Sequence, residues 1–435
     1  MANSYKAPRG TQDSLPINSA KIRNLEGILM NIARAFNYKE IRTPVFENTE
    51  VFTRGVGETT DVVQKEMYTF EDKGGRSITL RPEGTAGCIR AVVEHGLLNE
   101  ALPAKLCYLT SCYRYEKPQA GRLREFHQFG CECIGSALPA ADAQIITMGR
   151  QIFDFLGVQN ISLEINSIGC PYCRAEYQNA LKEYFSQYKD QLCGTCKERL
   201  EKNPMRLLDC KSPEDQEIAK GAPKITDYLC EECKNHFSKV KSYLDKNGVD
   251  YAVNPNIVRG LDYYTRTVFE FISNDIGAQG TVLGGGRYDG LVEELGGKPT
   301  PALGYAMGIE RLMLLLEAQG IDLSKDEAPD IYFANIGERA GEVCLSLASD
   351  LTEDGYTAEV DLMGRGLKAQ MKYANKIGAK FTAVIGDDDI EKGVINVKNM
   401  ESGEQTECRI YGFSEDFENL ILSEIIDDFG ESLDF

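Results

Sequence analysis

The sequence predicts an α+β fold: a domain built on an antiparallel sheet, interrupted by a helical insertion and followed by a small α/β domain. Three observations predict it. Pairs of strand-like segments separated by short turns recur in residues 1–325. A cysteine-rich segment with helical periodicity occupies residues 170–250. Strands alternate with helices over residues 330–425, as in βαβ units, so a small parallel sheet is expected there, after a polar linker at 322–330.

The N-terminal elements follow from simple periodicities. Apolar residues at helical spacing predict a helix over residues 20–38, and the extended stretch over 38–52 is interrupted by Pro44. Residues 67–80 predict a hairpin that turns at residues 73–75.

A second hairpin is predicted from the strand patterns at 105–116 and 124–135. Period-two alternation places Tyr108, Thr110, Cys112 and Arg114 on one face of the first strand. It likewise places Gln128, Gly130 and Glu132 on one face of the second strand. An arginine, an amide and a carboxylate thus converge on one surface, with further charges in the loop. A solvent-exposed sheet face with ordinary charges explains this pattern equally well.

Residues 79–87 form a strand end followed by a helix start at Thr85. Glu83 is placed there to neutralise an ammonium group, and the free backbone donors near Thr85 suit a carboxylate or a phosphate. A helix cap with a turn is the alternative.

Residues 258–271 alternate like a strand but begin with an arginine, a glycine, an aspartate and two tyrosines. The strand at 280–291 carries three consecutive glycines, and neither a GxxxxGK[ST] nor a GxGxxG loop accompanies it. If a nucleotide binds, arginines must hold its phosphates. Arg311, in the first turn of the next helix, is one candidate, although an exposed arginine is an equal alternative.

The formal net charge of −19 argues against nucleic-acid binding unless basic residues cluster locally. One stripe, Arg365, Lys368, Lys372 and Lys376, has helical spacing, and a solvated helix face is its alternative explanation. The first residues show no signal-peptide core and no run near 18 apolar residues occurs, so we expect a cytoplasmic protein without a membrane segment.

Fourteen cysteines in such a chain favour reduced thiols or metal ligands over disulfides. Seven of them lie between residues 170 and 233, including three CxxC pairs. A helix over 174–189 would carry the chain about 24 Å, at about 1.5 Å per residue, away from the first pair. This topology predicts a four-thiolate zinc site formed by the other two pairs, Cys193, Cys196, Cys230 and Cys233. Reduced thiols without a metal are the alternative.

Taken in order, five segments resemble the class II aminoacyl-tRNA synthetases, and specifically the histidyl-tRNA synthetase family. Three resemble the class II motifs: FNYKEIRTPVFENTEVF, YRYEKPQAGRLREFHQFGCE and ALGYAMGIERL. Two resemble stretches peculiar to the histidyl enzymes: VRGLDYY and GGGRYDGL. The resemblance implies ATP-dependent ligation of L-histidine to tRNA(His) through a histidyl-adenylate, in a homodimer that uses ATP and Mg²⁺.

The resemblance also implies roles for individual residues. The implied catalytic residues are Arg259 and Arg114, at the α-phosphate. The implied histidine-binding residues are Glu83, Gly84, Thr85, Arg114, Gln128, Glu132, Arg259, Tyr263 and Tyr264. The implied ATP-binding residues are Arg114, Glu116 and Arg311. The 330–425 domain would bind the anticodon, so the implied tRNA contacts are Lys117, Gln119, Arg122, Arg365, Lys368 and Lys372.

Two other functions are the alternatives. A catalytically inactive paralogue, acting as a regulatory or sensor subunit that binds histidine or uncharged tRNA, would be expected to lose Arg259, Arg311, the tyrosine pair or the C-terminal domain, all of which are present. A synthetase for another amino acid is disfavoured by RGLDYY.

Overall fold

The computed structural model describes residues 5–57, 60, 62–210, 212–277, 280–324 and 328–431, with side chains up to residue 423. The chain divides into two compact units, Met1–Ser324 and Lys325–Phe435. Of the expected linker at 322–330, residues 325–327 lie outside the described residues, and the others form neither helix nor strand. Among the described residues, none of the helices combines the length and apolar character needed to cross a bilayer.

The first unit is organised around a sheet of eight described strands in the order β1-β5-β6-β11-β10-β9-β7-β8. Its central strands pair antiparallel, and only the two edge strands β1 and β8 pair parallel. The bounds in sheet order are Lys39–Glu40, Ala104–Tyr113, Glu125–Ile134, Ala302–Gly308, Thr281–Arg287, Thr265–Ser273, Ile161–Ser167 and Ala252–Val253. The predicted antiparallel α+β architecture is confirmed.

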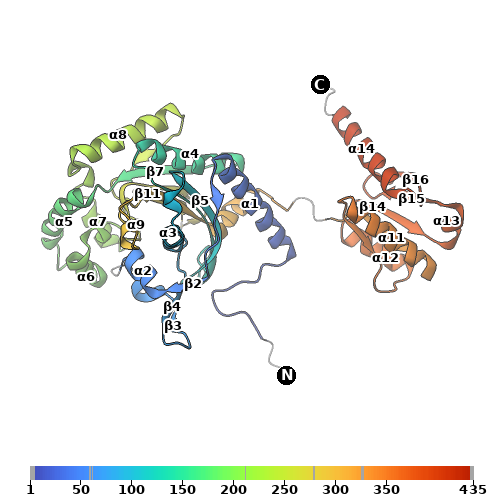
Figure 1. The fold of residues 1–435 in the computed structure, drawn as a ribbon, viewed down its shortest axis with the longest axis horizontal. Coiled ribbons are helices and arrows are strands. Elements are labelled where there is room, and N and C mark those ends of the chain that lie inside the picture. The colour runs from blue at the N-terminus through green and yellow to red at the C-terminus, as the bar shows by residue number, and fades with distance from the viewer. Residues whose placement is uncertain are drawn as a thin grey trace. The chain divides into compact units, whose positions relative to one another are not determined.

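Helices cover both faces of this sheet (Figure 1). On one face α1 (Pro16–Ala35), α4 (Pro139–Phe155), α8 (Glu231–Lys246) and α10 (Ile309–Ala318) form one hydrophobic core with the strands. On the other face α3 (Thr85–Glu94), α9 (Leu291–Glu294) and the insertion up to the first turn of α8 form a second core, which includes both tyrosines of RGLDYY. The helix predicted over 20–38 spans Pro16–Ala35, and of its apolar face Leu25 and Leu29 are buried whereas Ile22, Ile28 and Ile32 are partly buried against the same core.

A small sheet, β2-β4-β3, stands beside the large one. Its strands are Phe46–Asn48, Ser77–Leu80 and Thr69–Glu71, and Thr69 pairs with Thr79. The predicted hairpin at 67–80 is therefore confirmed, as is the helix start at Thr85. Two further elements of this region are α2 (Thr49–Val56) and the π-helical turn η1 (Val62–Glu66), and η2 (Leu97–Asn99) follows α3.

The strand predicted from residue 264 onward is broken by a bulge. Arg266 has φ 51°, and Gly286 pairs with Val268 whereas Arg287 pairs with Thr265. The strict alternation expected through residues 264–271 therefore fails at its start, since a bulge shifts side chains between faces.

The insertion lies between β7 and β8. It consists of α5 (Pro171–Ser186), α6 (Gly194–Lys202), η3 (Pro204–Leu207), α7 (Pro213–Ala219), η4 (Ile225–Asp227) and α8. Cys170 and Cys230 are the residues that precede the first turns of α5 and α8.

The predicted cysteine grouping is wrong. The prediction places Cys230 and Cys233 near the C-terminal end of the helix that follows Cys173. In the structure the chain returns through α6 and α7, and α8 begins near the N-terminal end of α5. The backbone N–H of Cys230 donates to Sγ of Cys173, at 3.1 Å. The two groups formed by the described residues are therefore Cys170, Cys173, Cys230 and Cys233, and Cys193, Cys196, Cys210 and Asp215.

The second unit contains a five-stranded sheet in the order β13-β12-β14-β15-β16 among its described residues. The βαβ pattern gives the expected parallel strands β13, β12 and β14, but β15 and β16 add an antiparallel hairpin. The elements are β12 (Ile331–Asn335), α11 (Glu338–Glu353), β13 (Ala358–Val360), α12 (Leu367–Lys376), β14 (Phe381–Ile385), α13 (Asp387–Lys392), β15 (Val394–Asn399), β16 (Gln405–Arg409) and α14 (Phe413–Glu431). Of the predicted acidic tail, residues 432–435 lie outside the described residues.

The basic stripe is only partly helical. Lys368, Lys372 and Lys376 are exposed on α12, at the expected spacing. Arg365 precedes the helix, where its Nη1 binds Asp361 at 2.8 Å and its guanidinium lies 4.4 Å from the Tyr373 ring centre. The expected four-residue helical face is therefore a three-lysine face.

Candidate active site

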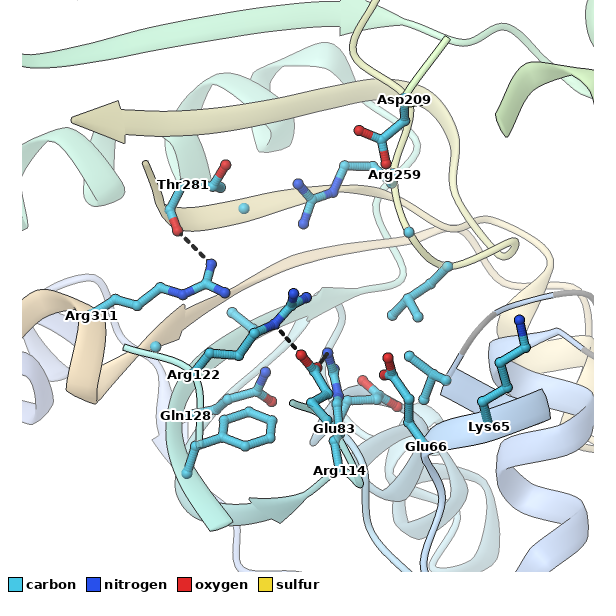
Figure 2. Close-up of a pocket in the computed structure, with 18 of the residues that line it drawn as sticks. Lys65, Glu66, Glu83, Arg114, Arg122, Gln128, Asp209, Arg259, Thr281 and Arg311 are labelled. Atoms are coloured by element: carbon cyan, nitrogen blue, oxygen red, sulfur yellow. Dashed lines mark hydrogen bonds and ion pairs between the residues drawn. The ribbon is translucent and has the colours of Figure 1, made fainter. Parts of the chain in front are cut away.

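A cavity of about 730 Å³ opens in the first unit. Segments far apart in the sequence line it: the start of α3, the β5–β6 hairpin, the loop before β9, strand β10 and the start of α10. Figure 2 shows side chains from these segments pointing into the same space. Most of the predicted substrate residues lie here: Glu83, Thr85, Arg114, Glu116, Gln128, Arg259, Tyr263, Tyr264 and Arg311.

The cavity is locally basic in an acidic chain. Its lining carries five acidic and seven basic side chains, against a formal net charge of −19 for the whole protein. The basic residues are Lys65, Arg114, Arg122, Arg199, Arg206, Arg259 and Arg311. Burial, and then the charges of Arg122 and Arg114, lower the pKa of Arg311. An anion bound among these guanidinium groups would relieve that repulsion, so the cavity suits a phosphate chain.

Arg259 belongs to the loop before β9, and its guanidinium lies over Gly284 of β10. Its guanidinium forms an ion pair with Glu270 and lies 5.5 Å from the Tyr264 ring centre. A Cβ on Gly284 would come within 2.4 Å of Nη2 of Arg259. The glycine run of β10 therefore serves close approach, because any side chain at residue 284 would displace the arginine.

Glu132 is a fully buried carboxyl group beneath the cavity. Its Oε1 accepts hydrogen bonds from the hydroxyls of Thr85 and Tyr108, both at 2.8 Å, and its Oε2 accepts one from Tyr288. Burial raises the pKa of Glu132 to about 8, although these hydroxyls favour the charged form. A Cβ on Gly304 would lie 1.7 Å from Oε2, so the site requires a glycine there as well.

Tyr108 and Tyr288 had no role in the sequence-based assignment. Tyr108 lies on the polar face of the strand predicted at 105–116, and Tyr288 lies in the segment GGGRYDGL, so both positions carry a signal in the sequence. Gly84 packs against the ring of Tyr108, where a Cβ would meet Cε2 at 2.2 Å. Gly84 therefore supports the site through this packing.

Glu83 caps helix α3. Its carboxylate accepts hydrogen bonds from the backbone N–H groups of Thr85, at 2.8 Å, and Ala86, at 2.7 Å. The capping alternative is thus correct, and the same carboxylate also lines the cavity. Burial raises the pKa of Glu83, which these backbone donors partly oppose.

The β5–β6 hairpin brings a second acid among the arginines. Tyr108 pairs with Gly130 and Thr110 with Gln128, so the predicted shared face is confirmed. Buried Glu116 forms an ion pair with Arg122 and lies 3.9 Å from Nη1 of Arg114.

The loop residues assigned to tRNA binding divide into two kinds. Lys117 and Gln119 are exposed, whereas Arg122 points into the cavity (Figure 2). The two tyrosines of RGLDYY pack together beyond it, with their ring centres 4.6 Å apart, and form a buried aromatic wall.

Comparisons with known proteins agree with this geometry. A family model described as histidyl-tRNA synthetase matches residues 10–312, and one described as an anticodon binding domain matches residues 330–420. The histidine–tRNA ligases of Caldanaerobacter subterraneus subsp. tengcongensis and Acetivibrio thermocellus are 55% and 54% identical to the chain. Each alignment covers 93% of this chain and 97% of the relative.

Among solved structures, the apo histidyl-tRNA synthetase of S. aureus superimposes with a TM-score of 0.82 at 41% identity, covering 95% of this chain and 100% of that one. The histidyl-tRNA synthetase family model spans most of the chain, and the two histidine–tRNA ligases are more than half identical to it over 93% of its length. The chain belongs to the histidyl-tRNA synthetase family.

Proposed function

We propose that the chain ligates L-histidine to tRNA(His) in two ATP-dependent steps, through a histidyl-adenylate. As a family member it is an aminoacyl-tRNA synthetase that uses ATP and Mg²⁺. The observation that supports the proposal best is the composition of the cavity, in which four arginines face hydroxyl and carboxyl groups. The arginines are Arg114, Arg122, Arg259 and Arg311. The arginines suit a triphosphate, and the hydroxyl and carboxyl groups suit a small amino acid with a polar ring.

The histidine would lie between α3 and the tyrosine pair. Glu83, Thr85 and Gln128 would hold its ammonium and carboxylate ends. Glu132 and Tyr264 would contact the imidazole ring, with Tyr263 beside them. A site built to satisfy two ring nitrogens rejects analogues that lack them, because its buried polar groups would remain unpaired.

ATP would occupy the arginine side of the cavity. Arg114 and Arg259 hold the α-phosphate, Arg311 the γ-phosphate, and Glu116 the adenine edge. Attack of the histidine carboxylate on the α-phosphorus builds negative charge, which fixed guanidinium groups stabilise without reorganisation. Glu270 holds Arg259 against the sheet until the phosphate arrives.

The acceptor end of tRNA(His) would enter past the β5–β6 loop, at Lys117, Gln119 and Arg122. The anticodon stem would meet the face of α12 that carries Lys368 and Lys372, with Arg365 at its start. Such phosphate contacts give salt-dependent affinity.

Homodimer formation, a cytoplasmic location and zinc in the insertion complete the proposal. Resemblance to the first class II motif supports the dimer, and light scattering of the purified protein tests it. The cysteine groups support zinc.

ATP–pyrophosphate exchange with each amino acid in turn tests the central proposal. We expect exchange with histidine alone. Arg259→Ala should lose about 3 kcal/mol of transition-state stabilisation, the scale of a lost preorganised donor. Arg150→Ala, which removes a surface arginine from α4, should leave exchange unchanged. Exchange with another amino acid, or none with any, would contradict the proposal, and the latter result would favour a regulatory paralogue.

The tRNA contacts need a separate test. Lys368→Ala with Lys372→Ala should weaken tRNA binding and reduce its salt dependence while leaving pyrophosphate exchange intact. Lys392→Ala, an exposed lysine on α13, is the matched control. Unchanged tRNA affinity in the double variant would remove α12 from the binding surface.

A further inference from the structure

Two compact groups of metal-ligand side chains lie in the insertion. Within each group the ligand atoms all lie within 4.8 Å of one another. The first, the α5–α8 group, is Cys170, Cys173, Cys230 and Cys233; the second, the α6–α7 group, is Cys193, Cys196, Cys210 and Asp215. Among the described residues these are the only sets of three or more such side chains that meet this distance limit.

The spacing within each group fits a single tetrahedral ion. Sγ of Cys170 lies 3.5 Å from Sγ of Cys173, and Sγ of Cys193 lies 3.8 Å from Sγ of Cys210. Four ligands bound at about 2.3 Å to one ion stand about 3.8 Å apart in a tetrahedron. The cysteines are free rather than disulfide-bonded, and the groups are too tight to enclose a multi-iron cluster.

The α5–α8 group joins two helix starts. Cys170 and Cys230 precede α5 and α8, and Cys173 and Cys233 lie in the first turns, fully buried. Four thiolates in tetrahedral array are the ligand set of structural zinc.

The α6–α7 group contains an unexplained buried acid. Asp215 is 2% exposed, and it accepts hydrogen bonds from the backbone N–H of Cys193, at 3.1 Å, and from Sγ of Cys210, at 3.2 Å. Among the described residues no basic side chain forms an ion pair with it. A buried carboxylate facing three thiols lacks a counter-charge, which a divalent cation would supply.

The α6–α7 group also borders the active-site cavity. Cys193 and Cys210 line the cavity. In the segment between them, Arg206 donates from Nη1 to the carbonyl oxygen of Gly260, at 2.8 Å, and Asn203 donates from Nδ2 to Oδ1 of Asp262, at 3.2 Å. The segment therefore holds the backbone next to Arg259.

We propose that the insertion binds two zinc ions, one in each group, and that the ion of the α6–α7 group braces the loop that positions Arg259. The first part stands on the ligand geometry alone. The second rests on the proposed function, because it assigns Arg259 to the activation of histidine.

Metal analysis of the full chain, purified without added metal, tests the sites. We expect two equivalents of zinc in the wild type and in Cys344→Ser, a control that removes a buried cysteine of the second unit. Cys233→Ser and Cys210→Ser should each retain one equivalent. Any other wild-type zinc count, iron in place of zinc, or full retention by either variant overturns the two-site assignment.

Asp215 gives a test that is independent of unfolding. Asp215→Ala should lose one equivalent of zinc, whereas Asp215→Cys should retain two, because a fourth thiolate replaces the carboxylate. If Asp215→Ala keeps both ions, Asp215 is not a ligand. If Asp215→Cys loses one although its melting temperature matches the wild type, the geometry is not that of a metal site.

Pyrophosphate exchange tests the bracing. Asp215→Ala should lower the histidine-dependent rate about tenfold, within the range of coupling through packed networks, and Asp215→Cys should restore it. Wild-type exchange in Asp215→Ala, after confirmed loss of zinc, overturns the bracing. A wild type with two zinc ions and no exchange would refute the proposed function and leave the two sites intact.

Discussion

Two buried carboxyl groups of the first unit, Glu132 beneath the cavity and Asp142 on α4, have opposite electrostatic fates. Three hydroxyls donate hydrogen bonds to Glu132, and burial raises its pKa to about 8. Burial acts in the same direction on Asp142, but its contacts with His236 and Arg287 lower the pKa of Asp142 below its usual range. The nature of the partners, rather than the depth of burial, decides the charge.

Under the proposed function, this difference separates a structural acid, Asp142, from an acid that binds the substrate, Glu132. The carboxylate of Asp142 is neutralised by an arginine of the protein itself, because Nη2 of fully buried Arg287 lies 2.5 Å from its Oδ2. Among the described residues Glu132 has hydrogen-bond donors but no cationic partner. An imidazole can bind a proton near neutral pH and then donates from both ring nitrogens, so under the proposed function it would supply that positive charge.

The largest expected effect comes from breaking the structural pair. Arg287→Met leaves Asp142 buried with only His236 as a partner, and we expect a loss of about 3–5 kcal/mol in the free energy of unfolding, measured by urea denaturation. Arg287→Met combined with Asp142→Leu should recover most of it. Similar losses in the single and double variants would show that packing, not charge, is responsible.

The pH dependence of Glu132 should be the next largest effect. A carboxyl with a folded pKa raised from 4.5 to about 8 stabilises the fold fully below pH 4.5, and this contribution is lost as pH rises to about 8. At about 1.36 kcal/mol per pH unit, wild type should lose about 2–3 kcal/mol between pH 5.5 and 7.5 relative to Glu132→Gln. Parallel stability curves for the two proteins would contradict the raised pKa.

Removing one hydroxyl from Glu132 should have a smaller effect. Tyr288→Phe deletes a donor to the carboxylate, so at pH 8.5 we expect a loss of about 1 kcal/mol in the free energy of unfolding. The control is Tyr332→Phe in the second unit, since the hydroxyl of buried Tyr332 has no hydrogen-bond partner among the described residues. An equal loss in both variants would mean that ring packing dominates.

The smallest effect should come from a surface pair. Arg150 on α4 binds Asp154 one turn later at 2.6 Å, and both side chains are substantially exposed. Solvent screens this pair, so Arg150→Ala should cost no more than about 0.5 kcal/mol in thermal unfolding. A loss near that of Arg287→Met would undo the argument that burial makes the structural pair strong.

Local patterns predicted the elements that depend on nearby residues. The start of α3, the hairpin at 67–80 and the shared face of β5 and β6 all follow from the alternation within each strand and from the turn signals between neighbouring elements. The resemblance supplied residues that the structure gathers in one cavity, among them Arg114, Arg259 and Arg311.

Features that depend on distant segments escaped prediction. The Arg287–Asp142 pair joins residues 145 positions apart. The cysteine groups depend on the path by which the chain returns to α5, and a single assumed helix direction was enough to pair them wrongly. The bulge at Arg266 has no signal in an alternating sequence, because positive φ at an arginine is rarely adopted.

The basic cavity in an acidic protein has a consequence for encounter with polyanions. Under the proposed function, a chain with net charge −19 repels RNA over most of its surface. Only orientations that present the acceptor end to the arginine cavity or the backbone to α12 escape this repulsion. The negative field around the protein thus repels RNA that approaches in unproductive orientations. Raising the ionic strength should weaken this orientational selectivity, because salt screens the repulsion and the attraction together.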